Sequence, residues 1–323
     1  MKKVWYSLLL IIIASSMFVS CNNETPKPQP ENPATDFEYE INEDNTATIT
    51  KYIGSSNIVV IPQKLENCIV TWIGGGAFAE TDVERVDVPD TVEVIDYSAF
   101  HTCASLAEIK LSKSLKLISI AAFCNCDSLQ KIDLSMDSLE DIAAQAFYEC
   151  DNLQEVVFGD NITAIGFSAF QECTSLEKVE LPRNLIELGE SAFKGCISLE
   201  SVFIPKTLSN CGMNVFFNNS SLDEIIFEEG IEKIGEYSAF ANCDSLEKIV
   251  IPASAKFIGM AAFAACDKLR EVYFLGNMPE EIGEFAFGEN KEALKIYYNP
   301  NSDGWDVTKM KEYNFNPLPD YKQ

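Results

Sequence analysis

The side chains that could do chemistry in this chain are one histidine, eleven cysteines and fifty acidic residues. A single histidine, His101, disfavours a multi-histidine zinc or iron site and most Ser-His or Cys-His catalysis. The adjacent acids Glu228-Glu229 and Glu280-Glu281 could serve a glycosidase, but in so acidic a chain we interpret them as solvated edges. The sequence therefore predicts no catalytic residue, no metal site and no cofactor.

The composition limits the partners of the chain. Its 323 residues hold 24 Lys+Arg against 50 Asp+Glu, a formal charge of -26 that repels polyphosphate, so we expect no nucleic-acid partner. Hydrophobic residues make up 47% of the chain and aromatic residues 11%, which is enough for a large buried core.

The first 35 residues carry the pattern of an exported protein. Lys2 and Lys3 precede a short apolar run over 4–13, and the run leads to Phe18-Val19-Ser20-Cys21, a pattern typical of a bacterial lipoprotein cleavage box. We expect residues 1–20 to be a signal peptide and Cys21 to become the lipidated first residue. The alternative is an ordinary secretory signal with an incidental cysteine. Residues 21–35 hold several prolines and predict a semi-rigid linker.

An internal repeat of 22 to 24 residues organises the rest of the chain. Its marker is Ala-Phe, followed after three residues by Cys, after six by Leu, and after nine and eleven by a pair of large apolar residues. The repeat phenylalanines are Phe78, Phe100, Phe123, Phe147, Phe170, Phe193, Phe216, Phe240, Phe263 and Phe287. One unit cannot bury both faces of its short strand, whereas stacked units share a core. This pattern predicts a solenoid.

The motif Cys-x-x-Leu-x-x-Ile-x-Leu-Pro followed by Leu-x-x-Ile-Gly-x-x-Ala-Phe, nearly complete between Cys173 and Phe193, resembles the BspA-type bacterial leucine-rich repeat. The resemblance implies an α/β-type repeat solenoid, curved, with short parallel strands on the concave face. It also implies surface-exposed, often lipid-anchored bacterial proteins used for adhesion or ligand binding. The resemblance implies no conserved set of catalytic residues, so none is assigned to this chain. The repeat departs from this pattern around 205–240, which could mark a bend, a site or a locally worn repeat.

The domain prediction follows from these segments. We expect a signal peptide over 1–20, a lipidated cysteine and linker over 21–35, an N-terminal β-hairpin cap over 36–57, the solenoid over 58–298 and a C-terminal cap over 299–323. A last strand is expected at 295–300, and Trp305, Tyr313 and Phe315 are expected to cover the end of the core.

Seven cysteines occupy one repeat position, so their side chains point the same way from successive coils. Parallel Cβ vectors do not favour disulfide geometry, and a one-dimensional row provides no convergent zinc ligands. We predict buried free thiols that act as small apolar fillers.

Two rows of side chains flank the buried strand residues. The first row alternates in charge from Arg85 and Glu108 to Glu271 and Lys295, and we interpret it as setting the strand register. The second row becomes apolar in its second half, and we call these five residues the stripe: Phe203, Ile226, Val250, Tyr273 and Tyr297. The stripe is the predicted ligand-binding surface. The alternative is that the C-terminal segment, or an inward curl of the solenoid, covers it.

The function expected from these features is non-catalytic. We predict a lipid-anchored protein of the bacterial cell envelope, exposed on the outer membrane, that binds a protein or host-matrix ligand through the strand face. The alternative is a glycan-binding accessory protein of polysaccharide capture, with a carbohydrate-active hydrolase less favoured.

Overall fold

The computed structural model describes residues 29–288, 294–305 and 314–318, without the side chains of 314 and 315. Residues Glu31–Gln323 form one compact unit. Among the described residues no helix is long and apolar enough to cross a membrane. The predicted signal peptide, Cys21 and Tyr313 lie outside the described residues.

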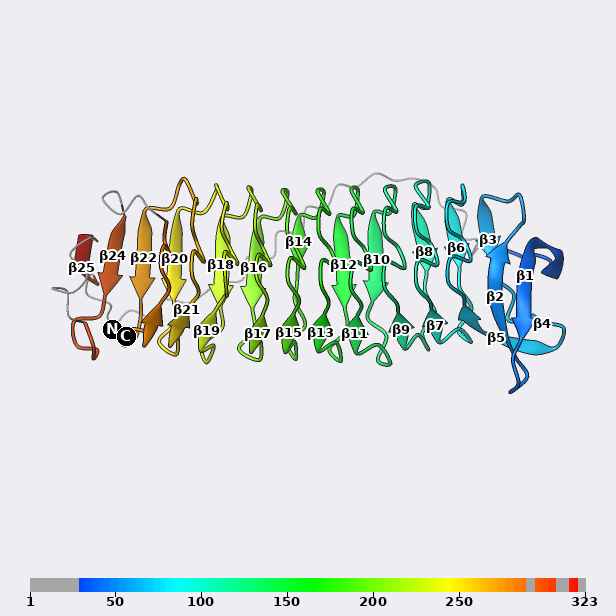
Figure 1. Ribbon diagram of the computed structural model, residues 1–323, viewed down its shortest axis with the longest axis horizontal. Helices are drawn as coiled ribbons and strands as arrows, with labels where there is room; N and C mark the ends of the chain where they lie inside the picture. Colours follow the sequence, from blue (N-terminus) through cyan, green and yellow to red (C-terminus); the bar gives the residue numbers. More distant parts are fainter. Residues whose placement is uncertain (1–28, 289–293, 306–313, 319–323) are drawn as a thin grey trace, which may run out of the picture. The chain divides into compact units, whose positions relative to one another are not determined.

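Each coil of the solenoid contributes two strands, and the strands stack into two columns, which we call the long and the short column because most strands of the first are longer (Figure 1). The long column consists of β3 (Ile58–Val60), β6 (Arg85–Asp87), β8 (Glu108–Lys110), β10 (Lys131–Leu134), β12 (Glu155–Phe158), β14 (Lys178–Val179), β16 (Ser201–Ile204), β18 (Glu224–Phe227), β20 (Lys248–Ile251), β22 (Glu271–Phe274), β24 (Lys295–Tyr298) and β25 (Asn314–Pro317). The short column consists of β5 (Cys68–Ile73), β7 (Val94–Ile95), β9 (Leu117–Ile118), β11 (Asp141–Ile142), β13 (Ala164–Ile165), β15 (Glu187–Leu188), β17 (Asn210–Cys211), β19 (Lys233–Ile234), β21 (Phe257–Ile258) and β23 (Glu281–Ile282). All pairings within the two columns are parallel.

The N-terminal segment adds an antiparallel hairpin to the short column. It contains the 3-10 turn η1 (Ala34–Asp36), β1 (Phe37–Ile41) and β2 (Thr46–Tyr52), and β2 pairs in parallel with β5. The strand β4 (Lys64–Leu65) pairs with β5 on the other side of a tight turn. Because η1 is the one helix among the described residues, the α/β part of the predicted fold class is not confirmed, and the coils consist of strands and turns.

The repeat phenylalanines form the centre of the core. Their rings stack on one another from Phe78 to Phe287 with centroid separations of 4.8 to 5.8 Å and interplanar angles of 4 to 16°. This spacing equals the distance between neighbouring strands in a sheet, so the stack follows directly from the repeat.

The repeat cysteines bond each coil to the one before it. Seven thiols donate to the carbonyl of the preceding coil's phenylalanine at 3.0 to 3.5 Å, from Cys103, Cys126, Cys150, Cys173, Cys196, Cys243 and Cys266. All seven are buried, as the spacing predicts, and all ten described cysteines are free. Burial raises the pKa of thiols such as Cys150 and Cys173 well above the ordinary value, so they stay protonated.

The C-terminal end differs from the expected one. The strand predicted at 295–300 is β24, but β25 adds a further parallel strand beyond it. The indole of Trp305 packs edge-on against Phe274 with ring centroids 5.0 Å apart and donates to the Gly276 carbonyl at 3.1 Å.

The long column is interrupted twice, after β8 and after β18, and the short column is interrupted once, after β17. The second interruption therefore falls between the same two coils in both columns. The chain is one residue longer here: Phe240 lies six positions after Ile234, whereas the other repeat phenylalanines lie five positions after the equivalent residue. The extra residue follows Gly235, whose φ of 62° is left-handed. This coil boundary lies inside the 205–240 segment that the sequence marks as irregular.

Candidate binding surface

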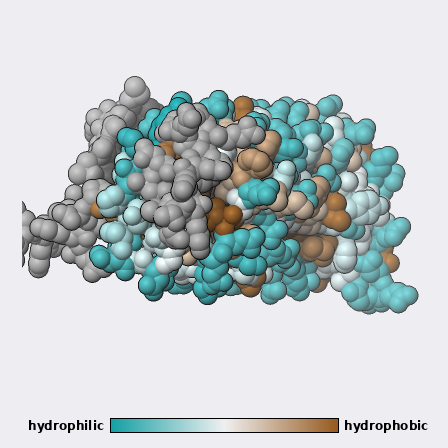
Figure 2. Space-filling view, turned by 60° about the vertical axis from the view of Figure 1, so that its left-hand side comes forward, coloured by the Kyte–Doolittle hydropathy of each residue, from teal (hydrophilic) through white to brown (hydrophobic). Residues whose placement is uncertain are grey.

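The stripe lies on the outer side of the long column. Its residues occupy equivalent positions on five strands, with Phe203 opposite Ile226 and Tyr273 opposite both Val250 and Tyr297. The exposed fractions of Phe203, Ile226 and Val250 are 36, 45 and 41%, and both tyrosines are half-buried. Apolar side chains gather in separate patches between hydrophilic ones on the face in Figure 2. The described residues therefore leave the stripe open to solvent.

The two tyrosines of the stripe form a rigid pair. Their rings stack with centroids 4.6 Å apart and an interplanar angle of 9°. Glu271, next to them on β22, accepts the Tyr273 hydroxyl at 2.7 Å and the Tyr297 hydroxyl at 3.5 Å. The hydrogen bond to Glu271 raises the pKa of Tyr273 to about 12, so its hydroxyl remains protonated. Since the rings stack from strand to strand, their faces point along the column and their edges point outward.

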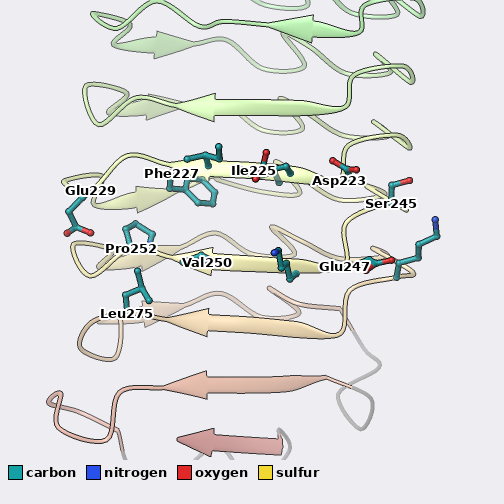
Figure 3. Close-up of a pocket in the computed structure, with 13 residues that line it drawn as sticks. Asp223, Ile225, Phe227, Glu229, Ser245, Glu247, Val250, Pro252 and Leu275 are labelled. Carbon is teal, nitrogen blue, oxygen red and sulfur yellow. The ribbon is translucent and has the colours of Figure 1, made fainter. Parts of the chain in front are cut away.

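A groove of about 870 Å³ opens beside the stripe where β18 and β20 are unpaired (Figure 3). Ile226 and Val250 contribute to its apolar lining. Asp223, Ser245 and Glu247 lie at the strand starts, while Glu229, Pro252 and Leu275 lie at the strand ends. Lys248 and Lys268 provide the positive charges of the lining, so acidic side chains outnumber basic ones.

Side chains in the turns bridge the two coils along the groove, in addition to backbone bonds such as that from the Asn214 amide to the Tyr237 carbonyl. The Ser254 hydroxyl accepts from the Gly230 amide at 2.8 Å and donates to the Ile231 carbonyl at 2.7 Å. The Glu229 carboxylate accepts from the Ala253 amide at 3.1 Å. The coil boundary is therefore held by turn residues, which the strand pattern did not indicate.

A second groove, of about 950 Å³, lies at the other interruption of the long column, between β8 and β10. Its lining at the stripe position is charged, with Lys110 and Asp133. Coils of 24 residues run from Phe123 to Phe147, from Phe216 to Phe240 and from Phe263 to Phe287, and the first two contain β10 and β18, which border the grooves. The step length alone does not locate the grooves, because β22 in the third such coil is paired on both sides.

The alternating charged row lies along the long column as predicted. The register aligns Arg85 with Glu108 and Lys131 with Glu155 across neighbouring strands, and both pairs form ion pairs, at 3.3 and 2.7 Å. Such exposed pairs contribute about 0.2–1 kcal/mol each, which suits a role in strand register.

The other candidate groups have structural partners. The half-buried His101 ring bonds through Nδ1 to the Thr102 hydroxyl at 2.8 Å. Glu228 accepts from the Lys206 amide at 3.0 Å, a bond that lowers the pKa of this carboxyl, and its carboxylate pairs with the Lys206 ammonium. Within the described ranges, no three His, Cys, Asp or Glu side chains are placed to hold a metal ion.

Parallel coils, a stacked aromatic core and a leucine six residues after most of the repeat phenylalanines define the chain as a leucine-rich repeat solenoid. The BspA type leucine-rich repeat region matches it over residues 71–196, 140–270 and 236–318, among six copies. The chain belongs to this family, as its sequence motifs indicated.

The chain is similar to several solved bacterial protein structures. A leucine-rich repeat protein of T. pallidum is 22% identical over 74% of this chain and 91% of its own, with a TM-score of 0.38. A leucine-rich cell surface protein of Faecalibacterium prausnitzii is 22% identical over 90% of this chain and 99% of its own, with a TM-score of 0.36. The pneumococcal vaccine antigen PcpA is 18% identical over 87% of this chain and 95% of its own, with a TM-score of 0.44. No curated protein matches the chain.

Proposed function

We propose that this protein is a non-catalytic surface lipoprotein that binds a protein ligand through the stripe and the groove beside it. The observation that carries the proposal is the open apolar row on the long column, formed by Phe203, Ile226 and Val250. Contiguous exposed apolar side chains on a soluble body commonly mark a contact site. The lipoprotein-type sequence ending at Cys21 and the proline-containing linker support attachment to the outer membrane, with the solenoid presented outside the cell.

The tyrosine geometry favours a protein ligand over a glycan. A sugar ring stacks on the face of an aromatic ring, but Tyr273 and Tyr297 each cover one face of the other, and the neighbouring strands place Val250 and Asn316 on their other sides. Their hydroxyl groups are already bonded to Glu271. Edges of aromatic rings beside aliphatic side chains suit the apolar anchors of a protein partner.

The charge of the groove defines the partner further. Asp223, Glu229 and Glu247 surround an apolar lining, and the chain as a whole carries -26. A partner with an apolar anchor flanked by basic side chains would gain from both features, and its association rate would fall with rising salt.

The test is a binding screen of residues 22–323 against host-matrix proteins and glycans, with the double variant Phe203→Ala/Tyr273→Ala alongside. We expect saturable protein binding that weakens at least tenfold in the variant, because two apolar anchors are lost. The matched control is Lys110→Ala/Asp133→Ala, which changes the same row in the other half of the solenoid and should leave binding intact.

Three outcomes would contradict the proposal. Glycan binding that is lost in the double variant would favour the polysaccharide-capture alternative. Hydrolysis abolished by substituting one acidic residue would make the protein an enzyme. Unfolding of the double variant, seen by circular dichroism, would show that the stripe contributes to the core instead.

A further inference from the structure

A second apolar row runs along the solenoid, at the residue three positions before each repeat phenylalanine. We call these residues the ridge: Gly75, Tyr97, Ile120, Ala144, Phe167, Glu190, Met213, Tyr237, Met260 and Glu284. The six large apolar members are more exposed than most of the stripe, with exposed fractions of 61% for Tyr97, 54% for Ile120, 49% for Phe167 and Tyr237, and 45% for Met213 and Met260. The ridge follows the short column, so it is a surface separate from the stripe.

The spacing of the ridge is fixed by an unbroken row of backbone hydrogen bonds. From Tyr97 onward, the carbonyl of each ridge residue accepts a hydrogen bond of 2.8 to 3.1 Å from the coil before it. The donor is the backbone amide of the residue that directly follows that coil's ridge residue. The row continues where both strand columns are interrupted, since the Asn214 amide bonds the Tyr237 carbonyl at 2.9 Å. With about 4.8 Å per coil, the ridge from Tyr97 to Met260 is roughly 34 Å long.

The ridge is nearly palindromic about Phe167. Moving outward from Phe167, Ala144 corresponds to Glu190, Ile120 to Met213, Tyr97 to Tyr237, and Gly75 to Met260. Five of the six large apolar members, from Tyr97 to Tyr237, thus correspond to one another or lie at the centre, and the small Ala144 corresponds to Glu190, while Met260 has no large counterpart. A two-fold contact between identical surfaces requires this kind of self-complementarity, because residue i then meets residue j and residue j meets residue i.

We propose that two copies of the protein associate along their ridges, antiparallel, about a two-fold axis beside Phe167. A second copy has the same coil spacing and stays in step over the whole ridge. A partner helix, at 5.4 Å per turn, would drift by about 0.6 Å per coil and lose register by roughly 4 Å over seven coils.

The size of the ridge sets the strength of the dimer. A strip about 34 Å long and about 12 Å wide covers on the order of 400 Å² per copy, about half of the roughly 800 Å² per partner of a standard interface. The dimer is therefore weak. Because each copy carries -26, screening by salt strengthens the dimer. This salt dependence is opposite to that expected for a basic ligand at the stripe.

Sedimentation equilibrium of residues 22–323 between 5 and 500 µM, in 0.05 and 0.5 M NaCl, tests the proposal. We expect a monomer–dimer equilibrium that tightens at high salt. Phe167→Glu should weaken it at least tenfold, because the two glutamates would face each other at the axis. Phe203→Glu on the stripe is the matched control and should leave the dimer unchanged. Monomers at every concentration, or a dimer that Phe203→Glu abolishes and Phe167→Glu spares, would overturn the proposal.

Single cysteines locate the axis independently of dimer strength. Phe167→Cys should form a covalent dimer under mild oxidation, since each copy meets its own residue there. Tyr97→Cys alone should not, but it should cross-link to Tyr237→Cys when the two variants are mixed. The repeat cysteines are buried, and the half-buried Cys68 is changed in every variant by Cys68→Ser so that it does not compete. Failure of Phe167→Cys to cross-link, or cross-linking of Tyr97→Cys to itself, would refute the two-fold axis.

Discussion

At the scale of single residues, one side chain interrupts the ladder of cysteine thiols. Asn219 takes the position of the repeat cysteine and is fully buried, yet neither its Nδ2 nor its Oδ1 has a hydrogen-bond partner among the described residues. The thiols on either side, at Cys196 and Cys243, both donate to a phenylalanine carbonyl. An unpaired buried amide costs about 1–3 kcal/mol, so this coil is locally destabilised.

Asn219→Cys should therefore stabilise the protein. The new thiol would reach the Phe193 carbonyl as its neighbours reach theirs, and the unpaired amide would disappear. We expect a gain of about 1–2 kcal/mol, measured from the urea midpoint. The reverse change, Cys196→Asn, should destabilise by a comparable amount. No gain from Asn219→Cys would mean that a bound water already satisfies the amide.

At the scale of the coil, close backbone contact fixes a column of glycines at the turn after the short strand. A Cβ atom added at Gly189 would lie 2.5 Å from the backbone carbon of Gly166 and the nitrogen of Phe167. Gly212 meets the backbone of Glu190 in the same way. The distance between coils cannot grow there, because the ridge hydrogen bonds run through the same turn.

Gly189→Ala is expected to destabilise the protein by at least about 2 kcal/mol, because backbone atoms rather than a flexible side chain must move. Ala143→Gly is the matched control: Ala143 takes the same position in an earlier coil, and its replacement should cost less than about 1 kcal/mol. Urea unfolding of the two variants checks the difference. Equal effects would show that the coils separate easily at this turn.

The repeat made most of the coil predictable from sequence. Phe170 and Cys173 have equivalents at fixed spacing along the chain, and residues at equivalent repeat positions stack on one another in a solenoid. The core, the buried thiols and the charged row could therefore be predicted directly from the sequence. The ridge was missed because Phe167 lies in a turn, and only the strand flanks were considered as surfaces. The departures from the repeat pattern near Glu236 indicated an irregular coil. Which row of strand hydrogen bonds an extra residue interrupts, however, depends on the path of the backbone. The residue pattern placed the stripe on one face, while the exposure of Val250 depends on what lies over it.

At the scale of the whole molecule, the excess of acid works against compactness. Six ion pairs occur within the described residues, and all involve partly exposed side chains. Partial burial, with Asp151 and Glu149 nearby, raises the pKa of the Asp127 carboxyl. Protonation of such a group favours the folded state, so its contribution to stability grows as the pH falls through the folded pKa.

We expect the melting temperature to rise by a few degrees when NaCl increases from 20 to 300 mM, and also when the pH falls from 7 through the raised pKa of Asp127. Asp127→Asn should raise the melting temperature at pH 7 and reduce its dependence on both salt and pH. Asp44→Asn is a control of opposite sign, because hydrogen bonds from Thr46 lower the pKa of Asp44 and its loss should destabilise. A melting temperature that does not change with salt concentration would contradict the prediction, because it would show that the repulsion between acidic side chains is already relieved at low salt.

The row of repeat cysteines also requires the chain to fold before its thiols are oxidised. Its cysteines escape oxidation in the finished molecule because they are enclosed, but a newly emerged chain exposes all of them at once. In an oxidising compartment, folding and random cross-linking then compete, and one wrong bridge between distant coils would block stacking. Repeats that contact only their neighbours close quickly, since each coil needs only the one before it. The short distance between partners in the chain is what allows so many reactive groups to be enclosed before they meet.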